Sequence, residues 1–313
     1  MKKILEYIKF ESIKRILKDD RTKRVLAIVL FSIVVIIFIL SIMKLINKSK
    51  FQKATNYSAN ELENLRNNKI IEQQIEEEQK AKQEEEKNKK YQPLSESEIE
   101  EVEHIYKHSE PKRVFLTFDD GPTKQVTPYI LNLLKQENIK ANFFVLGLRV
   151  KENPEIVKQE YEAGHFIGNH GYSHEYSSIY ESVNSVFTEF GQTNRLIRQA
   201  IGNDKFNTLV FRFPGGLAGG KYNDLKLEAA QKLKENGVAN VDWNALTNDA
   251  GGAKTKEALL KNFYETIEDK TSVVLLMHDA ADKILTYEVL PEIISYFRDN
   301  GFEFKTISDI IGR

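Results

Sequence analysis

Two carboxylates and two imidazoles in this chain could together hold one divalent metal ion. Asp119 and Asp120 stand side by side in the run Thr-Phe-Asp-Asp-Gly-Pro, and His170 and His174 follow in Asn-His-Gly-Tyr-Ser-His. Two histidines and one aspartate form a ligand set that leaves coordination positions open. Zinc suits such a set best, and cobalt, nickel or iron fit the same geometry. The second aspartate would then be free to act as a general base.

Both motifs also occur often without a chemical role. Asp-Asp-Gly-Pro is a common turn sequence, and histidines four residues apart can simply lie on a surface. His104 and His108 provide a comparison within the chain, because they have the same spacing but no strand end or aspartate pair nearby. We interpret those two as structural or incidental. His165 opens a predicted strand and is interpreted as a packing residue.

A third histidine could supply the proton that a leaving group needs. His278 ends the apolar run Val-Val-Leu-Leu-Met, and an imidazole titrates near neutral pH. A neighbouring carboxylate would raise the pKa of His278 and keep the ring protonated. Together with a metal set and a base, the chain therefore holds the groups that metal-assisted hydrolysis requires.

The chain from residue 113 onward alternates between strand-like and helix-like stretches. This alternation predicts a parallel β/α architecture. Several predicted helices end in glycine-containing turns, such as Asn236-Gly237 and Asn300-Gly301, as helices with a left-handed cap do. The seven predicted strands are residues 114–118, 142–146, 166–169, 209–213, 239–243, 273–277 and 302–306, and the predicted helices are residues 126–137, 154–163, 179–201, 224–236, 256–269 and 285–300.

The chemically useful side chains fall at equivalent places in this pattern. In a (β/α) barrel the active site is built from the C-terminal ends of the strands. The aspartate pair 119–120, His170, Arg212 and His278 each lie at or just after the end of a predicted strand. Positions that are far apart in the sequence are therefore expected on one face of one domain.

Residues from about 110 to 313 resemble the polysaccharide deacetylase family, also called the NodB-homology or carbohydrate esterase family 4 domain. Five separated motifs carry this resemblance in the expected order, over nearly two thirds of the chain. The resemblance implies a distorted, incomplete (β/α) barrel of about seven parallel strands. It also implies a metal-dependent hydrolase that removes N-acetyl groups from a polysaccharide.

The resemblance further implies roles for the residues already described. Asp119 would be the general base, and Asp120 would bind the metal together with His170 and His174. His278, in Leu-Leu-Met-His-Asp, matches the general acid of the family.

Other motif residues would orient the base and enclose the substrate. Arg212, in Arg-Phe-Pro-Gly-Gly, resembles the arginine that orients the catalytic aspartate. The N–H of Gly215 falls where the family has an oxyanion donor, which a main-chain amide can supply. Leu276 matches the wall of the pocket for the acetyl methyl group, and Pro214 and Trp243 are further expected substrate contacts.

Two motifs depart from the family pattern. The family often has Arg-Pro-Pro-Tyr-Gly where this chain has Arg-Phe-Pro-Gly-Gly, so a tyrosine side chain is missing. When the family's Trp-x-Val-Asp-x-x-Asp-Trp is aligned on Trp243, Asp249 takes the place of the aspartate that tunes the acid histidine, and Ala250 that of the second tryptophan. Asp242, beside Trp243, precedes the strand end by too much for that role. A wider groove with fewer stacking side chains is therefore expected.

The composition of the 313 residues excludes several other kinds of protein. A net charge of −1 gives no basic footprint for nucleic acid. The absence of cysteine excludes disulfides, thiolate zinc sites and cysteine nucleophiles, and it suits a bacterial protein outside the cytoplasm. No feature of the sequence predicts an oligomeric state.

An apolar stretch near the N-terminus predicts attachment to a membrane. Residues 25–43 carry no charged side chain, and a stretch of this length is just enough to cross a bilayer as a helix. A buried core helix would have a polar face, and a cleaved signal peptide would have a shorter leader and an Ala-x-Ala site. Nine Lys or Arg residues precede the stretch, so by the positive-inside rule the N-terminus stays in the cytoplasm.

These features divide the chain into four segments. Residues 1–24 form a cytoplasmic basic segment, 25–46 a transmembrane signal anchor, 47–110 an extracellular charged stalk and linker, and 111–313 the catalytic domain. Residues 61–90 contain Glu and Lys at helical i,i+4 spacing but few apolar residues, so a long coiled coil is not expected. A solvated helix and a disordered spacer are both consistent with this composition.

A catalytic domain held outside a single-pass membrane anchor would work in the cell-wall space. We therefore expect its substrate to be the N-acetylglucosamine of peptidoglycan. An exopolysaccharide of N-acetylglucosamine and chitin oligomers are alternatives with the same chemistry, and an O-acetyl ester is a further one. A catalytically inactive wall-binding protein of the same fold, or a function residing in the membrane segment, would be alternatives of a different kind.

Overall fold

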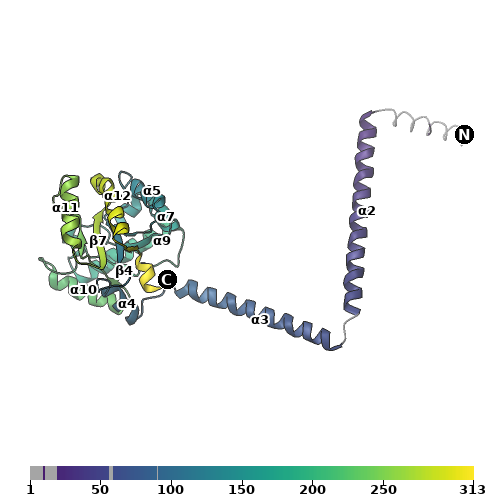
Figure 1. Cartoon of the computed structure of the whole chain (residues 1–313), viewed down its shortest axis with the longest axis horizontal. Helices are drawn as coiled ribbons and strands as arrows, with labels where there is room; N and C mark the ends of the chain where they lie inside the picture. Colours follow the sequence, from purple (N-terminus) through teal and green to yellow (C-terminus); the bar gives the residue numbers. More distant parts are fainter. Residues whose placement is uncertain (1–9, 11–19, 56–58, 90) are drawn as a thin grey trace. The chain divides into compact units, whose positions relative to one another are not determined.

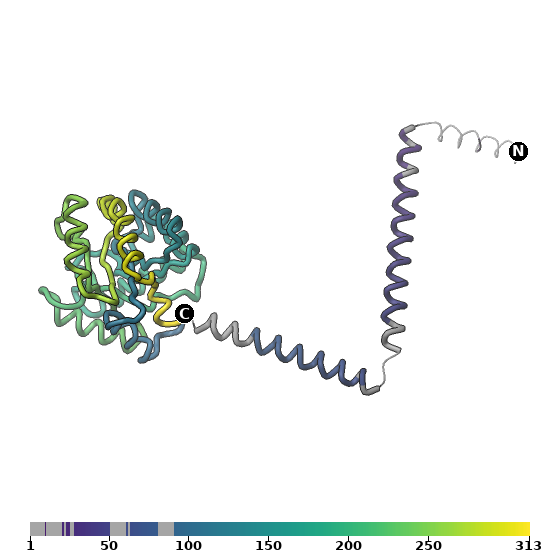
Figure 2. The backbone as a smooth tube through the Cα atoms, in the orientation of Figure 1, coloured from purple at the N-terminus to yellow at the C-terminus, as the bar shows by residue number. Residues whose placement is uncertain are grey.

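The computed structural model describes residue 10 and residues 20–55, 59–89 and 91–313. These residues form two compact units that divide between Ala81 and Lys82. The backbone of each unit can be followed in Figure 2. Most of the expected cytoplasmic segment, residues 1–24, lies outside the described residues.

Two long helices hold the described residues from Asp20 to Ala81, and the second of them continues to Lys89. Helix α2 (Asp20–Thr55) contains a stretch, Lys23–Lys50, that is long and apolar enough to cross a membrane and is not buried by protein. Helix α3 (Ala59–Lys89) covers about half of the expected stalk. Within it, Glu76 and Lys80 form an exposed i,i+4 ion pair at 2.7 Å. Residues 59–89 are therefore helical, which was one of the two expectations for the stalk.

The second unit is built around one sheet of eight strands in the order β5-β4-β3-β2-β1-β7-β6, with β8 also paired to β1. All seven pairings are parallel, as the sequence predicts. The sequence missed β6, because a strand of two residues has no periodicity to detect. The strands are β1 (Arg113–Asp119), β2 (Asn142–Val145), β3 (Phe166–Asn169), β4 (Val210–Phe211), β5 (Ala239–Asn240), β6 (Ala245–Leu246), β7 (Ser272–His278) and β8 (Glu303–Phe304).

The sheet curls until its two edges are joined by a very short segment. Strands β5 and β6 stand at opposite ends of the strand order, yet only residues 241–244 separate them in the sequence. A connection of that length spans at most about 18 Å, so the two edges must be close. The N–H of Val241 donates to the carbonyl of Phe211, and the N–H of Asn244 donates to that of Val274. The result is the incomplete barrel that was expected, and the predicted strand 239–243 was too long because residues 241–244 form this bridge.

Helices surround the strands of this unit, as Figure 1 shows for α5, α7, α9, α11 and α12. Helix α9 begins where Ser182 accepts a hydrogen bond from the Ser185 N–H and ends at Gly202, whose φ is 68°. The predicted helix 179–201 is interrupted before this cap, and the short helix α6 was not predicted. The helices are α4 (Glu96–Glu103), α5 (Thr127–Gln136), α6 (Gly147–Glu152), α7 (Pro154–Glu162), α8 (Tyr176–Ile179), α9 (Val183–Ile201), α10 (Asn223–Glu235), α11 (Lys256–Ile267), α12 (Ile284–Asp299) and α13 (Ile307–Ile311).

Alternate residues of β1 belong to different layers of the core. Leu116 and Phe118 join the apolar cluster that packs beneath the outer helices, whereas Phe115 belongs to a second cluster with Phe144 and Val274. Side chains two residues apart on a strand point to the same face. Thr117 and Asp119 therefore share the face of Phe115, and this face becomes polar toward the C-terminal end of the strand.

Candidate active site

The three predicted metal ligands meet beyond the C-terminal ends of β1 and β3. Oδ1 of Asp120 lies 3.5 Å from Nε2 of His170 and 3.5 Å from Nε2 of His174. One ligand atom from each residue lies within 4.8 Å of the other two, as donors around a single ion do. This group could therefore hold one metal ion.

The chemistry of these side chains also fits a metal. Nδ1 of His170 lies 2.8 Å from the carbonyl oxygen of Arg212, which places the ring proton on Nδ1 and leaves a lone pair on Nε2. Burial lowers the pKa of His170 to about 3, so the ring is neutral, as a metal ligand must be. Oδ1 of Asp120 is buried without a hydrogen-bond partner among the described residues, a costly state that a cation would relieve.

The turn after β1 separates the two adjacent aspartates. Asp120 has a φ of 73°, so the backbone turns out of the strand directly after Asp119. Gly121 is required here because a Cβ at this position would lie 2.0 Å from Oδ2 of Asp279. The backbone N–H of Asp279 donates to the carbonyl of Asp119, and its carboxylate accepts a hydrogen bond from Thr127. Asp279 thus packs against the turn and stabilises it.

Asp119, the predicted base, lies inside the barrel and is 2% exposed. Its Oδ1 lies 2.8 Å from Nη1 of Arg212, and its Oδ2 lies 3.8 Å from Nε2 of His170, on the side of the metal ligands. Burial raises the pKa of Asp119, although the charges of Arg212 and His278 oppose this shift. The carboxylate is therefore a stronger base than a solvated aspartate.

Arg212 is completely buried, and its guanidinium is held on several sides. Nη1 donates to Thr117 as well as to Asp119, Nε donates to the carbonyl of Val241 at 3.0 Å, and Nη2 donates to the carbonyl of Asp242 at 2.9 Å. A buried arginine is tolerated only with such partners. Because two of the acceptors belong to the bridge at residues 241–244, closure of the barrel also orients the arginine.

His278, the predicted acid, ends β7 directly opposite Asp119 in the β1–β7 ladder. Its Nδ1 lies 2.8 Å from Oδ1 of Asp249, whose Oδ2 accepts hydrogen bonds from the His278 N–H and from Thr286. Burial alone would lower the pKa of His278, but the hydrogen bond and charge of Asp249 raise it to about 9. The ring is therefore protonated at neutral pH.

The Arg-Phe-Pro-Gly-Gly segment forms a tight turn on the same side of the barrel. Gly215 has a φ of 77° and is exposed, whereas Pro214 is buried beneath it. The hydroxyl of Tyr180 fixes the turn by donating to the carbonyl of Pro214 at 2.7 Å. Leu276 lies opposite Thr117 in the ladder, so it shares the interior face with His278.

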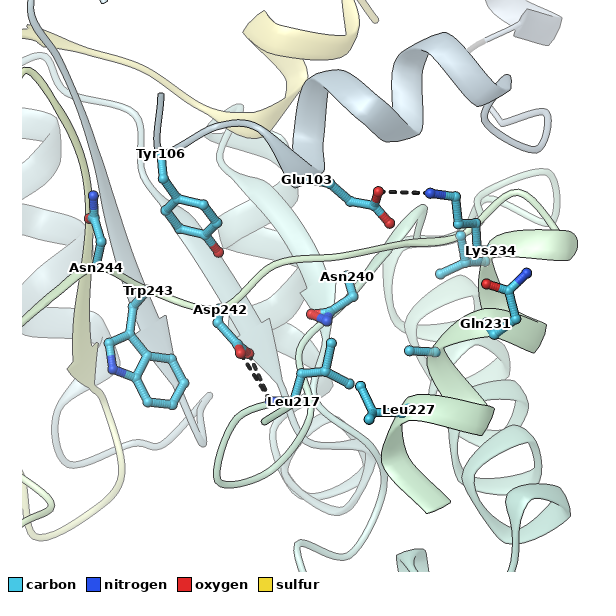
Figure 3. A pocket seen from close by; sticks show the side chains of 12 residues that line it. Glu103, Tyr106, Leu217, Leu227, Gln231, Lys234, Asn240, Asp242, Trp243 and Asn244 are labelled. Atoms are coloured by element: carbon cyan, nitrogen blue, oxygen red, sulfur yellow. Dashed lines mark hydrogen bonds and ion pairs between the residues drawn. The ribbon is translucent and has the colours of Figure 1, made fainter. Parts of the chain in front are cut away.

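Trp243 lies in the bridge and lines a separate cavity of about 470 Å³, shown in Figure 3. None of the residues expected to act as metal ligand, base or acid lines this cavity. Tyr106 and Leu217 also line it, and the Asp242 carboxylate accepts a hydrogen bond from the Leu217 N–H at 3.0 Å. A Cβ on Gly216 would approach the Trp243 ring to 3.2 Å. Trp243 thus packs behind the glycine turn, and its contact with substrate stays a prediction.

The remaining histidines lie away from this site. Nδ1 of His165 is within 3.0 Å of the Ala141 N–H, which makes it the buried packing residue that was expected. His104 caps the end of α4, and exposed His108 lies near Thr271 and Glu110. Neither histidine of the comparison pair contacts the candidate metal ligands within the described part of the chain.

The structure adds two residues that sequence reasoning missed. Asp279 is buried and supports the turn after β1. Its position directly after His278 was the only signal in the sequence. Tyr176 lies beside His174, with the two ring centroids 5.6 Å apart. Its place two residues after a metal-ligand candidate was the only signal, and a tyrosine at the start of a helix has no distinctive pattern.

Comparison with known proteins gives results that agree with this geometry. The family model described as polysaccharide deacetylase matches residues 106–238. A peptidoglycan-N-acetylglucosamine deacetylase of Bacillus cereus is 33% identical over 199 residues, which are 63% of this chain and 69% of the relative. A protein of the same name from Listeria monocytogenes is 31% identical over 72% of this chain, and the matched region spans only 43% of that longer relative.

Solved structures show the same relationship. The structure of a Streptococcus mutans CE4 esterase matches with a TM-score of 0.60 and 30% sequence identity. The match covers 69% of this chain and 96% of the esterase chain. The similarity therefore extends over nearly the whole of the esterase domain.

Proposed function

This chain belongs to the polysaccharide deacetylase family, and on that premise we propose that it is a metal-dependent hydrolase acting on N-acetylglucosamine. The reaction would remove N-acetyl groups from a cell-wall polysaccharide, and peptidoglycan is the substrate that we propose. The catalytic unit would be residues 111–313.

One observation carries this proposal more than any other. Asp119 and His278 end two strands that pair directly, so the proposed base and the proposed acid stand opposite each other in one ladder. Asp119 is held by a buried arginine, and His278 is held by a buried carboxylate. The metal-ligand group lies on the side of Asp119, because Oδ2 of Asp119 is 3.8 Å from Nε2 of His170. An amide placed between these groups would meet everything that its hydrolysis needs.

Each protein group would have one task in the reaction. Asp119 would accept the proton of the attacking water, while Arg212 keeps that carboxylate in place. The Gly215 N–H would donate a hydrogen bond to the oxygen that develops negative charge. His278 would then protonate the departing nitrogen through Nε2, the ring nitrogen that does not contact Asp249, and an amine and acetate would be released.

Asp120, His170 and His174 would hold the metal, and zinc is the ion that we propose. Two imidazole nitrogens and one carboxylate oxygen suit zinc, with cobalt, nickel or iron possible by the same donors. When bound, such an ion supplies Lewis acidity toward a carbonyl oxygen and toward water. The neutral state of His170 supports this assignment, and so does Oδ1 of Asp120, which has no hydrogen-bond partner among the described residues.

We further propose that α2 anchors the catalytic unit to the cell membrane. Its stretch Lys23–Lys50 has the length and apolar character that a single span needs. With the basic residues on the cytoplasmic side, the catalytic unit would lie outside the membrane, near the wall. The names of the relatives from Bacillus and Listeria support peptidoglycan as the substrate.

The test is acetate release by the full-length, zinc-loaded chain in detergent. Peptidoglycan, poly-N-acetylglucosamine and chitin oligomers are compared as substrates, and Asp119→Asn serves as the matched inactive control. Release that is fastest from peptidoglycan and lost in the control is the expected result. Faster release from either other glycan would replace peptidoglycan as substrate.

A wall-binding protein without activity is the alternative of a different kind. It would bind peptidoglycan but release no acetate from any of the three glycans. The filled base, acid and metal-ligand positions argue against it. Zinc analysis of the same sample ensures that a missing metal is not mistaken for a missing activity.

A further inference from the structure

Tyr176 occupies a place at the candidate active site that none of the assigned roles explains. It begins α8, two residues after His174, and its ring centroid lies 5.6 Å from that of His174 and 5.7 Å from that of Tyr180. Its side chain is nevertheless 42% exposed. The ring is thus packed on one side and open to a ligand on the other.

The hydroxyl of Tyr176 stands directly over the glycine turn. A Cβ built on Gly215 would lie only 2.5 Å from Oη of Tyr176 and 3.2 Å from Cζ. A hydrogen bond from the Tyr180 hydroxyl to the carbonyl of Pro214 restrains the turn on its other side. A side chain at position 215 would therefore force the Tyr176 hydroxyl to shift. Glycine at this position makes room for a tyrosine that comes from another part of the chain.

The same distance shows that the hydroxyl and the Gly215 N–H can reach one atom. The amide nitrogen and a Cβ are both bonded to the same Cα and are about 2.5 Å apart. Oη of Tyr176 can therefore be no more than about 5 Å from the Gly215 nitrogen. An oxygen that accepts from both donors at ordinary lengths allows them to be as much as about 5.6 Å apart. The distance between the two donors therefore allows one oxygen atom to accept both hydrogen bonds.

The hydroxyl is also available to a ligand. No hydrogen bond joins it to another residue within the described part of the chain. A phenol carries its proton at neutral pH, so it can donate. Its ring already packs against the rings of His174 and Tyr180.

We propose that Tyr176 is a second donor to the substrate oxygen that binds at the Gly215 N–H. The carbonyl oxygen of the acetamide would accept one hydrogen bond from the main chain and one from this side chain. The inference rests on the proposed N-acetyl hydrolysis, and it adds a catalytic residue to that reaction. On this proposal, Gly215 does not simply lack the tyrosine side chain that the family often has, because glycine leaves space for the Tyr176 hydroxyl.

The test compares Tyr176→Phe with wild type in the full-length, zinc-loaded chain. Phenylalanine keeps the ring contacts and removes only the donor. Because charge develops on the oxygen in the transition state, we expect kcat to fall about ten- to hundredfold while KM changes less than threefold. Tyr129→Phe is the matched control, since Tyr129 is an exposed tyrosine of α5 whose ring packs on that of Tyr287. It should behave as wild type.

Two results would overturn the inference. An unchanged kcat in Tyr176→Phe would show that the hydroxyl does not stabilise the transition state. A higher KM at unchanged kcat would show that the hydroxyl contacts the sugar instead of the reacting oxygen. An equal zinc content and an equal Tm in all three proteins separate these results from structural damage. A wild-type protein that releases no acetate would refute the proposed function itself and the tyrosine's role with it, whereas an active wild type with an unaffected variant refutes only the role of Tyr176.

Discussion

The pair formed by His278 and Asp249 offers the sharpest test of the proposed chemistry. Asp249→Asn keeps the size of the side chain and removes its charge. In the wild type, the hydrogen bond and charge of Asp249 overcome the effect of burial and raise the pKa of His278 to about 9. In the variant, burial remains while the carboxylate is gone. We therefore expect the pKa of His278 to fall to the ordinary value or below it.

The size of the effect follows from the fraction of protonated His278. With a pKa of about 9, the acid is almost fully protonated at pH 8. With the ordinary histidine pKa of about 6.5, only about 3% would remain protonated, a loss of roughly thirtyfold. Because the acid works in its protonated form, the deficit should grow as pH rises. With the pKa at its ordinary value the deficit should shrink to less than about twofold near pH 6, and a lower pKa would move this limit to lower pH.

The assay measures kcat for acetate release between pH 5.5 and about pH 10. This range covers both the ordinary pKa of a histidine and the raised pKa of His278. The wild type should lose activity as pH rises through about 9, and Asp249→Asn should lose it at least two pH units lower. Thr286→Val is the matched control, because it removes one hydrogen bond to Asp249 but leaves the carboxylate. Its high-pH limb should stay near that of the wild type.

A deficit of the same size at every pH would refute this reasoning, because it would show that Asp249 does not act through the charge of His278. If the pH dependence of kcat is unchanged in Asp249→Asn, the limb at high pH does not report an acid His278 whose pKa is set by Asp249. Zinc content and Tm are measured for each variant, so that loss of metal or of folding is recognised.

Three further predictions follow from buried groups. Arg212→Met should lower the unfolding free energy by about 3–5 kcal/mol, measured by denaturant titration, because it leaves Asp119 buried and unpaired; unchanged stability would contradict the ion pair. His170→Ala should lose bound zinc in elemental analysis while Tm falls only modestly, and a variant that retains one zinc per chain would refute the ligand set. Glu160→Gln should raise Tm at pH 7 to 8 but not near pH 4, because burial raises the pKa of Glu160 well above its usual range and both its oxygens lack partners among the described residues. The wild type therefore loses stability relative to Glu160→Gln as pH rises above about 4.5. A difference in Tm between the two proteins that is the same at every pH would exclude ionisation of Glu160 as the cause.

Much of the fold was predictable because strands and helices show their periodicity in the local sequence. The apolar strands and amphipathic helices of residues 113–313 have periods of two and about 3.6, which a sequence displays directly. Parallel strands then place their C-terminal ends on one face, so the sequence alone predicts that Asp119, His170, Arg212 and His278 lie together. The structure brings all four to that face.

The boundaries that failed have a common cause. Strand β6 and the bridge at residues 241–244 exist because two sheet edges come together, not because of a local pattern. The predicted strand 239–243 followed apolar alternation past the point where the chain leaves the ladder. Short strands at the edge of a barrel are defined by their partners, which single-sequence periodicity does not contain.

The sequence by itself determined which chemical groups this protein has and the face on which they gather. Only the tertiary structure decided how those groups are tuned. The partners of Arg212, the support that Asp279 gives the turn, and the approach of Tyr176 to Gly215 all join positions far apart in the chain. Such contacts depend on distances of a few ångströms and on exclusion of water, and both arise only when the barrel closes.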